Sequence, residues 1–244
     1  PTFNLIGNPD IPASLYAKLV VDVGSALSGK SSEPHWENQT KIYTEKLIEA
    51  HRVLGEIPTF KKILDLLHNE NSMATFITTL ELAELGNPDA ASLRAELSQR
   101  FIGGEVGGNE RSSVISTMIA ALSNFAQFEC FNCDKSSFRY DQFDEGALVF
   151  VVVPADYNAQ KQYLCTFLKL LFYQHGQRRF DSPETLKEKN MLILEIDEAQ
   201  QLLTKSTDGF GDHSMTGVLR EAKMIVIMAT QSLAAIRAKL DNKD

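Results

Sequence analysis

Polar residues follow two apolar segments of the chain at points where they could support nucleotide hydrolysis. The sequence LILEIDEAQ places Asp197 and Glu198 directly after one apolar run, and IVIMATQS places Thr230 and Gln231 after another. In nucleotide hydrolases one carboxylate holds the Mg²⁺ that bridges the phosphates, and a second group positions or deprotonates the attacking water. A glutamine nearby can contact the γ-phosphate or orient that water. The pattern indicates phosphoryl-transfer chemistry, although an acidic helix N-terminus after a strand would also account for the two carboxylates.

An arginine precedes the second of these segments. Arg220 lies in the sequence VLREAK, shortly before the apolar run that ends at Gln231. An arginine contributed across a subunit boundary can stabilise charge in the transition state of phosphoryl transfer. The alternative is a solvated helix end. The order of DE, R and ATQS along the chain favours the functional interpretation.

The sequence GSALSGKSS contains a match to the phosphate-binding pattern G-x-x-x-x-G-K-[ST] at residues 24–31. Such a loop should follow a buried strand and open a helix. The apolar spacing over residues 12–27 instead predicts a helix that runs into the match. Pro34 would clash with a carbonyl in any helix begun at Gly29. The context therefore favours a connecting loop that resembles a phosphate loop, and the match stays a hypothesis to be tested.

The composition is that of an ordinary globular protein. The net charge of −8 argues against a surface broadly adapted to nucleic acid, although a narrow DNA channel remains compatible with it. Three cysteines are too few for a disulfide framework, and a reducing cytoplasm is expected. Cys130 and Cys133 form a C-x-x-C, but no second ligand pair completes a zinc site, so two small residues in a loop or strand are the favoured interpretation.

Two different hydrophobic patterns divide the chain near residue 128. Residues 36–128 show helical spacing in successive segments. Beyond them, 147–154, 190–198 and 222–231 are short apolar runs typical of strands buried on both faces, with helical patterns between them. Strands that alternate with helices predict a parallel α/β sheet. Functional residues are then expected at the carboxyl ends of the strands.

Residues 129–244, and less sharply the whole chain, resemble the type IV secretion coupling proteins of the TraD/TraG group. The sequence LILEIDEAQQLL is similar to the family's Walker B strand, and LREAKMIVIMATQSLAAI is similar to the next strand with its glutamine motif. FDEGALVFVVVPADY resembles the preceding strand, and GGNERSSVISTMIAAL resembles part of the family's helical insertion. The resemblance implies an α/β fold, a partial RecA-like P-loop NTPase sheet with an inserted all-helical domain.

The resemblance also implies roles for individual residues. Asp197 corresponds to the carboxylate linked to Mg²⁺, Glu198 to the catalytic carboxylate, Gln231 to the sensor and Arg220 to the motif arginine, while Thr230 lies at the nucleotide. The implied cofactors are ATP and Mg²⁺.

The domains expected on this basis are a lead-in to the nucleotide domain (1–34), the all-helical domain (35–128) and the nucleotide domain (129–244). In the family the phosphate loop lies upstream of a segment like PTFNLIGNP. The chain is therefore expected to be a soluble fragment without that loop or the membrane-spanning N-terminus, and not to hydrolyse ATP unaided.

The parent protein is expected to be a hexameric ATP-driven translocase at the cytoplasmic side of the bacterial inner membrane. Its partners would be other copies of itself, secretion-channel proteins, single- or double-stranded DNA, and a relaxase–DNA complex or secreted protein substrate. Two alternatives remain open. The chain could be a non-catalytic module that docks substrate, or part of the related ATPase that assembles the secretion channel.

Overall fold

A computed structural model of the 244-residue chain describes residues 2–28, 34–84, 86–103, 108–181, 183–204 and 211–240. The chain divides into two compact units, one formed by residues 1–25 and 29–137 and the other by 26–28 and 138–244. The division falls after residue 137, whereas the hydrophobic pattern changes near residue 128. Over the described ranges, no helix combines the length and apolar character needed to cross a membrane.

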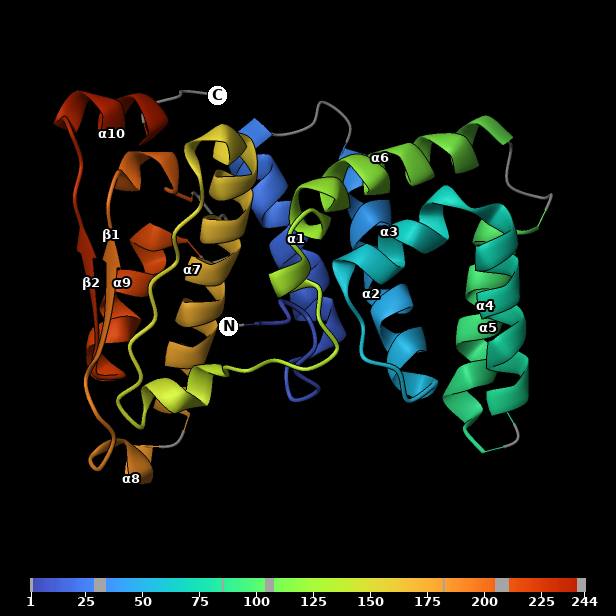
Figure 1. Ribbon diagram of the computed structural model, residues 1–244, viewed down its shortest axis with the longest axis horizontal. Helices are drawn as coiled ribbons and strands as arrows, with labels where there is room; N and C mark the ends of the chain where they lie inside the picture. The colour runs from blue at the N-terminus through green and yellow to red at the C-terminus, as the bar shows by residue number, and fades with distance from the viewer. Residues whose placement is uncertain are drawn as a thin grey trace. The chain divides into compact units, whose positions relative to one another are not determined.

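Within its described residues, the first unit contains helices and loops but no strand (Figure 1). Its elements are α1 (Ala13–Ser28, of which residues 26–28 belong to the second unit), α2 (Pro34–Val53), α3 (Phe60–His68), α4 (Glu70–Ala83), α5 (Pro88–Phe101), α6 (Gly108–Ala126) and the 3₁₀ turn η1 (Glu129–Phe131). Helix α6 packs on α2 and α3, and α4 packs on α5. Phe60 and Phe125 stack in the core with ring centroids 4.9 Å apart, and both are fully buried. The helical pattern predicted from residue 36 onward is confirmed.

Local sequence signals set the helix starts in this unit. Thr59 caps α3, because its side chain accepts a hydrogen bond of 3.0 Å from the Lys62 backbone N–H. Asn87 caps α5 in the same way through the N–H of Asp89, and Pro88 occupies the first turn, where its missing N–H has no cost. These caps explain why the chain breaks at the GNPD and IPTF sequences.

Cys130 and Cys133 help to tie the N-terminal segment to the end of the unit. The Cys130 carbonyl accepts a 2.7 Å hydrogen bond from the Phe3 N–H, and the Cys133 carbonyl accepts one of 2.8 Å from Asn4 Nδ2. Both thiols are free, and Cys130 is exposed. The C-x-x-C thus contributes backbone carbonyls to a loop.

The second unit contains a parallel pair of strands with helices on one side (Figure 1). In chain order it comprises η2 (Tyr140–Phe143), η3 (Ala155–Tyr157), α7 (Asn158–Phe180), α8 (Pro183–Leu186), β1 (Leu192–Ile196), η4 (Ala199–Gln201), α9 (Asp212–Glu221), β2 (Met224–Met228) and α10 (Leu233–Leu240). Leu192 pairs with Met224 at one end of the sheet and Ile196 with Met228 at the other. The two strands predicted in 190–198 and 222–231, and their parallel order, are confirmed.

Helix α7 packs closely against α9 and β2 because Gly176 leaves no side chain between them. A methyl group at Gly176 would lie 2.5 Å from Met224 Sδ and 2.8 Å from Leu219 Cδ2. Both neighbours are buried, as are Leu192 and Ile196 on the same side of the sheet. This packing fixes the position of β2 relative to α7 and α9.

The strand predicted at 147–154 is wrong as an element, because no strand forms there. Leu148, Phe150 and Val152 are 79%, 80% and 87% exposed, whereas Val149 and Val151 are about half as exposed, which is the alternation of an extended chain. The backbone groups of 148–153 form no hydrogen bond to another described residue. Apolar sequence favours a strand, but a strand exists only where a neighbour pairs with its backbone.

The expectation that the strands are buried on both faces is also wrong. Ile193, Ile225 and Ile227 are 59%, 43% and 48% exposed, while Leu192 and Met224 on the opposite face are buried. Within the described residues only one face of this sheet is covered by helices. The sheet is therefore half-buried in spite of its continuous apolar sequence.

The phosphate-loop match lies partly outside the described residues. Its first five residues, 24–28, are the last residues of α1. In a helix their N–H groups bond to carbonyls one turn earlier and cannot encircle a phosphate. The remaining residues, 29–31, which include Lys30, lie outside the described residues. The helix predicted over 12–27 is confirmed, and the described half of the match has the wrong backbone for a phosphate loop.

Candidate functional site

The acidic pair occupies a tight turn at the carboxyl end of β1. Asp197 Oδ1 accepts a hydrogen bond of 2.9 Å from the Glu198 N–H, and Glu198 has a left-handed backbone with φ of 52°. The two strands stay paired into this turn, because the Ala229 N–H donates to the Ile196 carbonyl and the Ala199 N–H donates to the Ala229 carbonyl, each at 2.9 Å. A non-glycine residue in the left-handed region is uncommon and is often found at functional sites.

Glu198 and Gln231 meet across the ends of the two strands. Gln231 Nε2 donates a hydrogen bond of 3.0 Å to Glu198 Oε1, and Gln201 Nε2 donates one of 2.6 Å to Oε2. Both carboxylate oxygens therefore accept from neutral amides, which fixes the orientation of the group and leaves its negative charge in place. Asp197 is exposed beside it. Parallel strands bring together two motifs that are more than thirty residues apart in sequence.

Thr230 lies at the same edge and links it to η4. Its hydroxyl donates a hydrogen bond of 2.8 Å to Gln200 Oε1 and contacts the Ser232 carbonyl at 3.2 Å. The hydroxyl thus helps hold the turn after β1 against the turn after β2. Its position at the nucleotide remains a prediction.

Arg220 is not brought to this edge. It is exposed in the last turn of α9, and its carbonyl accepts a hydrogen bond from the Lys223 N–H just before β2 begins. The Lys223 carbonyl in turn accepts a hydrogen bond of 2.9 Å from the Leu192 N–H at the amino end of β1. Arg220 therefore lies at the opposite end of the strands from Asp197 and Gln231. Within one copy of the chain it cannot act with them, so a role in transition-state stabilisation requires a second copy.

The donor groups at the acidic edge fit Mg²⁺ bound together with a nucleotide. Magnesium prefers oxygen ligands and is usually held by one or two carboxylates plus phosphate oxygens and water. Asp197 presents an exposed carboxylate with one oxygen already used by the turn. The described residues contain no group of three or more His, Cys, Asp or Glu side chains arranged to hold a metal. A metal at this edge would therefore depend on oxygens supplied by its nucleotide partner.

Several residues that build this edge were not identified from the sequence. Gln201 directly contacts Glu198, and its place three residues after the carboxylate was the only signal available. Lys169 in α7 and Asp212 at the start of α9 form a buried ion pair of 2.6 Å behind the turn. A lysine inside the apolar run LKLLFY is unusual, since charged residues are rarely buried unless they are paired. That exception could have marked it.

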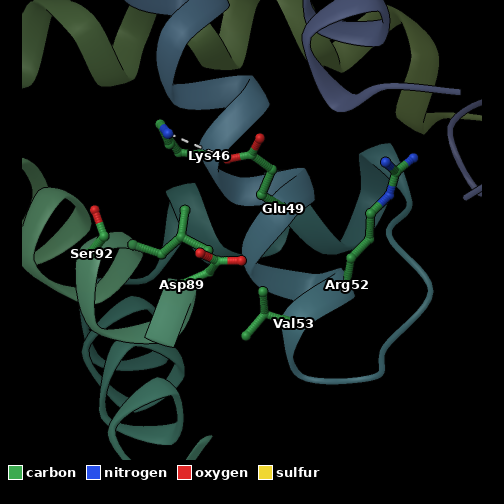
Figure 2. Close-up of a pocket in the computed structure, with 7 residues that line it drawn as sticks. Lys46, Glu49, Arg52, Val53, Asp89 and Ser92 are labelled. Carbon is green, nitrogen blue, oxygen red and sulfur yellow. Dashed lines mark hydrogen bonds and ion pairs between the residues drawn. The ribbon is translucent and has the colours of Figure 1, made fainter. Parts of the chain in front are cut away.

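The helical unit contains a separate groove between α2 and α5 (Figure 2). It encloses about 430 Å³. The groove is lined by Lys46, Glu49, Arg52, Val53, Asp89, Ser92 and Leu93. Figure 2 shows Asp89 projecting from α5 toward α2, Lys46 paired with Glu49 and the Arg52 guanidinium directed away from Asp89. The groove is therefore a charged, open surface feature suited to a polar partner.

Comparison with known proteins identifies the family. The family described as "Type IV secretory system Conjugative DNA transfer" matches residues 16–242, which cover both structural units. No curated protein and no solved structure showed a significant match to the chain. The family match includes α1, the helical region, the acidic turn and the glutamine turn. The chain belongs to the type IV secretory system conjugative DNA transfer family, and its role lies in DNA transfer through such a system.

Proposed function

We propose that the chain is part of an ATP-driven translocase that couples DNA or protein substrate to the conjugation channel. The observation that carries the proposal is the 3.0 Å hydrogen bond between Glu198 and Gln231 at the shared carboxyl edge of β1 and β2. Ligands of open α/β sheets bind outside the carboxyl ends of the strands. A carboxylate held there by amides, next to an exposed aspartate, is suited to phosphoryl transfer to water.

Each residue has a defined part in this proposal. Mg²⁺ with ATP supplies a polarised γ-phosphate when bound. Asp197 contributes an oxygen ligand or a hydrogen-bond acceptor for the hydrated ion. Glu198, whose carboxylate is oriented by Gln201 and Gln231, accepts a hydrogen bond from the attacking water. Gln231 would contact the γ-phosphate and pass a change there to Glu198, whose Oε1 accepts a hydrogen bond from its amide.

The proposal extends to the parent assembly. A RecA-like sheet would be completed by strands beyond β1 and β2, and a hexameric ring would bring Arg220 of one copy to the acidic edge of the next. That arrangement accounts for the separation of Arg220 from Asp197 within one chain. A relaxase–DNA complex would be the substrate, at the cytoplasmic side of the inner membrane. These features are part of the proposal and follow from the family resemblance.

The proposal is tested by conjugative transfer from cells in which the protein carries Glu198→Gln. Gln keeps the size of Glu198 and removes its negative charge. Loss of a positioned base typically lowers a rate by about 10²–10⁴-fold, so transfer frequency should fall by roughly 10²-fold or more. The matched control is Glu195→Gln, which neutralises an exposed carboxylate in β1. If Glu198→Gln transferred DNA as frequently as the wild type and Glu195→Gln, that result would contradict the proposal.

A second candidate function, substrate docking without catalysis, is favoured by the groove between α2 and α5. Glu49 is already paired with Lys46, but Asp89 projects into the groove and offers a carboxylate to a basic side chain of a protein partner. Docking predicts that Asp89→Arg lowers transfer while Glu198→Gln leaves it unchanged. The catalytic proposal predicts loss in Glu198→Gln whatever Asp89→Arg does.

A further inference from the structure

A buried ammonium group lies behind the acidic edge. Lys169 in α7 is 2% exposed and is surrounded in its own helix by buried apolar residues that include Phe167, Leu170 and Phe172. Removing an ammonium ion from water costs several kcal/mol unless it is fully paired. An apolar residue here could equally pack α7 against the core. The charge of this lysine must therefore be compensated by the groups that surround it.

Lys169 is hydrogen-bonded to the connection between β1 and β2. Its Nζ donates to the Leu202 carbonyl at 2.5 Å and contacts Thr204 Oγ1 at 3.3 Å. It also contacts both oxygens of Asp212, at 2.8 and 2.6 Å. Three ammonium donors thus meet a carbonyl, a hydroxyl and a carboxylate.

Asp212 is held by further donors in the same cluster. The Thr204 N–H donates a hydrogen bond of 2.7 Å to Asp212 Oδ2, and the Tyr173 hydroxyl donates to Oδ1. Burial and the neighbouring Asp212 charge raise the pKa of Tyr173, so its hydroxyl stays protonated and remains a donor. The cluster formed by Lys169, Tyr173, Thr204 and Asp212 is termed the α7 clasp below.

The α7 clasp joins the two ends of one chain segment. Leu202 ends the turn η4 that begins directly after Glu198, and Asp212 is the first residue of α9. Helix α9 leads into β2, whose carboxyl end positions Gln231. Both sides of the Glu198–Gln231 contact are therefore connected, through the chain, to groups that Lys169 holds.

We propose that Lys169 is a positioning residue for the acidic edge. By binding both Leu202 and Asp212, it fixes the end of the Glu198 turn relative to the start of α9, and so sets the places of Glu198 and of the helix that carries Arg220. The expected effect of Lys169 on DNA transfer rests on the proposed function. The effect of the α7 clasp on the structure of the Glu198 turn does not depend on that function.

Two variants separate positioning from simple stabilisation. Lys169→Met leaves the Asp212 carboxylate buried without its cation, which is strongly destabilising. The double variant Lys169→Met with Asp212→Leu removes both charges, and such apolar replacements often restore stability. The control is Lys161→Met, the same substitution near the start of α7 at a partly exposed site. If Lys169→Met does not fold, the double variant decides alone because it contains no unpaired buried charge.

The first readout is amide hydrogen exchange in the 244-residue chain. We expect the Gln201 amide, whose N–H bonds to the Glu198 carbonyl at 2.9 Å and is altered by neither substitution, to exchange at least tenfold faster in the double variant, although its denaturation midpoint returns close to that of the wild type. The Lys161→Met control should exchange like the wild type. Unchanged exchange at Gln201 would overturn the proposal, whatever the outcome of any nucleotide or transfer experiment.

The second readout is conjugative transfer. A positioning role predicts at least a tenfold loss of transfer in the double variant despite its restored midpoint, whereas a purely stabilising role predicts recovery to the wild-type level. Recovery would overturn the proposal. The Glu198→Gln variant distinguishes failure of the proposed function from failure of the positioning role of Lys169. Normal transfer by Glu198→Gln would contradict the catalytic function, and hydrogen exchange would still test the positioning role.

Discussion

Gln231 and Glu198 are joined by a side-chain hydrogen bond of 3.0 Å, although they lie thirty-three residues apart on the turns that follow two different strands. The contact is a consequence of parallel pairing, which continues from Ile196 into the turns through Ala229. In the proposed function, Gln231 would contact both this carboxylate and the bound phosphate and would transmit a change from one to the other.

Replacement of Gln231 should affect function far more than folding. The side chain is exposed, so Gln231→Ala should change the free energy of unfolding by less than about 0.5 kcal/mol. Transfer frequency should fall roughly tenfold or more, since Glu198 loses one of its two orienting amides. Denaturant unfolding and conjugative transfer measure the two effects. A large loss of stability, or wild-type transfer, would contradict the assignment.

Two helical glycines should respond in opposite directions to alanine. At Gly176 the new methyl group would press on Met224 and Leu219, so Gly176→Ala should destabilise the chain by about 1–3 kcal/mol. At Gly217 in α9 there is nothing within 4 Å, and Gly217→Ala should stabilise it by roughly 0.5–1 kcal/mol through helix propensity. Chemical denaturation of both variants checks the packing of α7. Equal shifts would show that α7 does not lie as close to β2 as described.

Acid should destabilise the second unit through His175. Burial lowers the pKa of His175, although Asp144 Oδ1 lies 3.5 Å from its Nε2 and favours the charged form, while Arg179 and Lys189 oppose it. The unfolded chain takes up this proton near pH 6.5, before the folded chain does. The stabilising contribution of neutral His175 is therefore complete above that pH and is lost as the pH falls below it, by up to about 1.4 kcal/mol per pH unit.

The measurement for His175 is the free energy of unfolding between pH 8 and pH 5, for the wild type and for His175→Gln. The variant should lose less stability than the wild type over the acidic part of this range. Burial also lowers the pKa of His51 in the first unit, so a residual pH dependence is expected in the variant. If the free energy of unfolding declined equally with pH in both proteins, His175 would not be a cause of the acid destabilisation.

Local signals allowed much of the fold to be predicted. Caps at Thr59 and Asn87 depend on a few neighbouring residues, and the runs that became β1 and β2 are followed by turns that the sequence marks clearly. The segment 147–154 had the same apolar character but formed no strand, because pairing depends on a neighbour that periodicity does not reveal. For the same reason the exposed face of Ile193 and Ile225 was not foreseen.

The candidate site was predictable only where its chemistry lies within motifs. Asp197, Glu198 and Gln231 could be singled out because each follows an apolar run at a strand end. Lys169 and Asp212 could not be paired from the sequence, since they are forty-three residues apart and their contact depends on how α7 packs against α9. Contacts between side chains that support a site depend on tertiary packing, which the sequence does not reveal. The only sequence signal for this ion pair is a charged residue within an apolar run.

The most direct test of the account is nuclear magnetic resonance of the 244-residue chain with Mn²⁺ in place of Mg²⁺, added with excess ATP. Mn²⁺ shares the preference of Mg²⁺ for oxygen ligands, and its unpaired electrons broaden nearby signals even in weak complexes. We expect broadening of the side-chain amide signals of Gln201 and Gln231 in the wild type and in Lys30→Ala, and its loss in Asp197→Ala. Broadening abolished by Lys30→Ala, or no broadening at the two glutamines in the wild type, would contradict the claim that the acidic edge is the nucleotide-metal site.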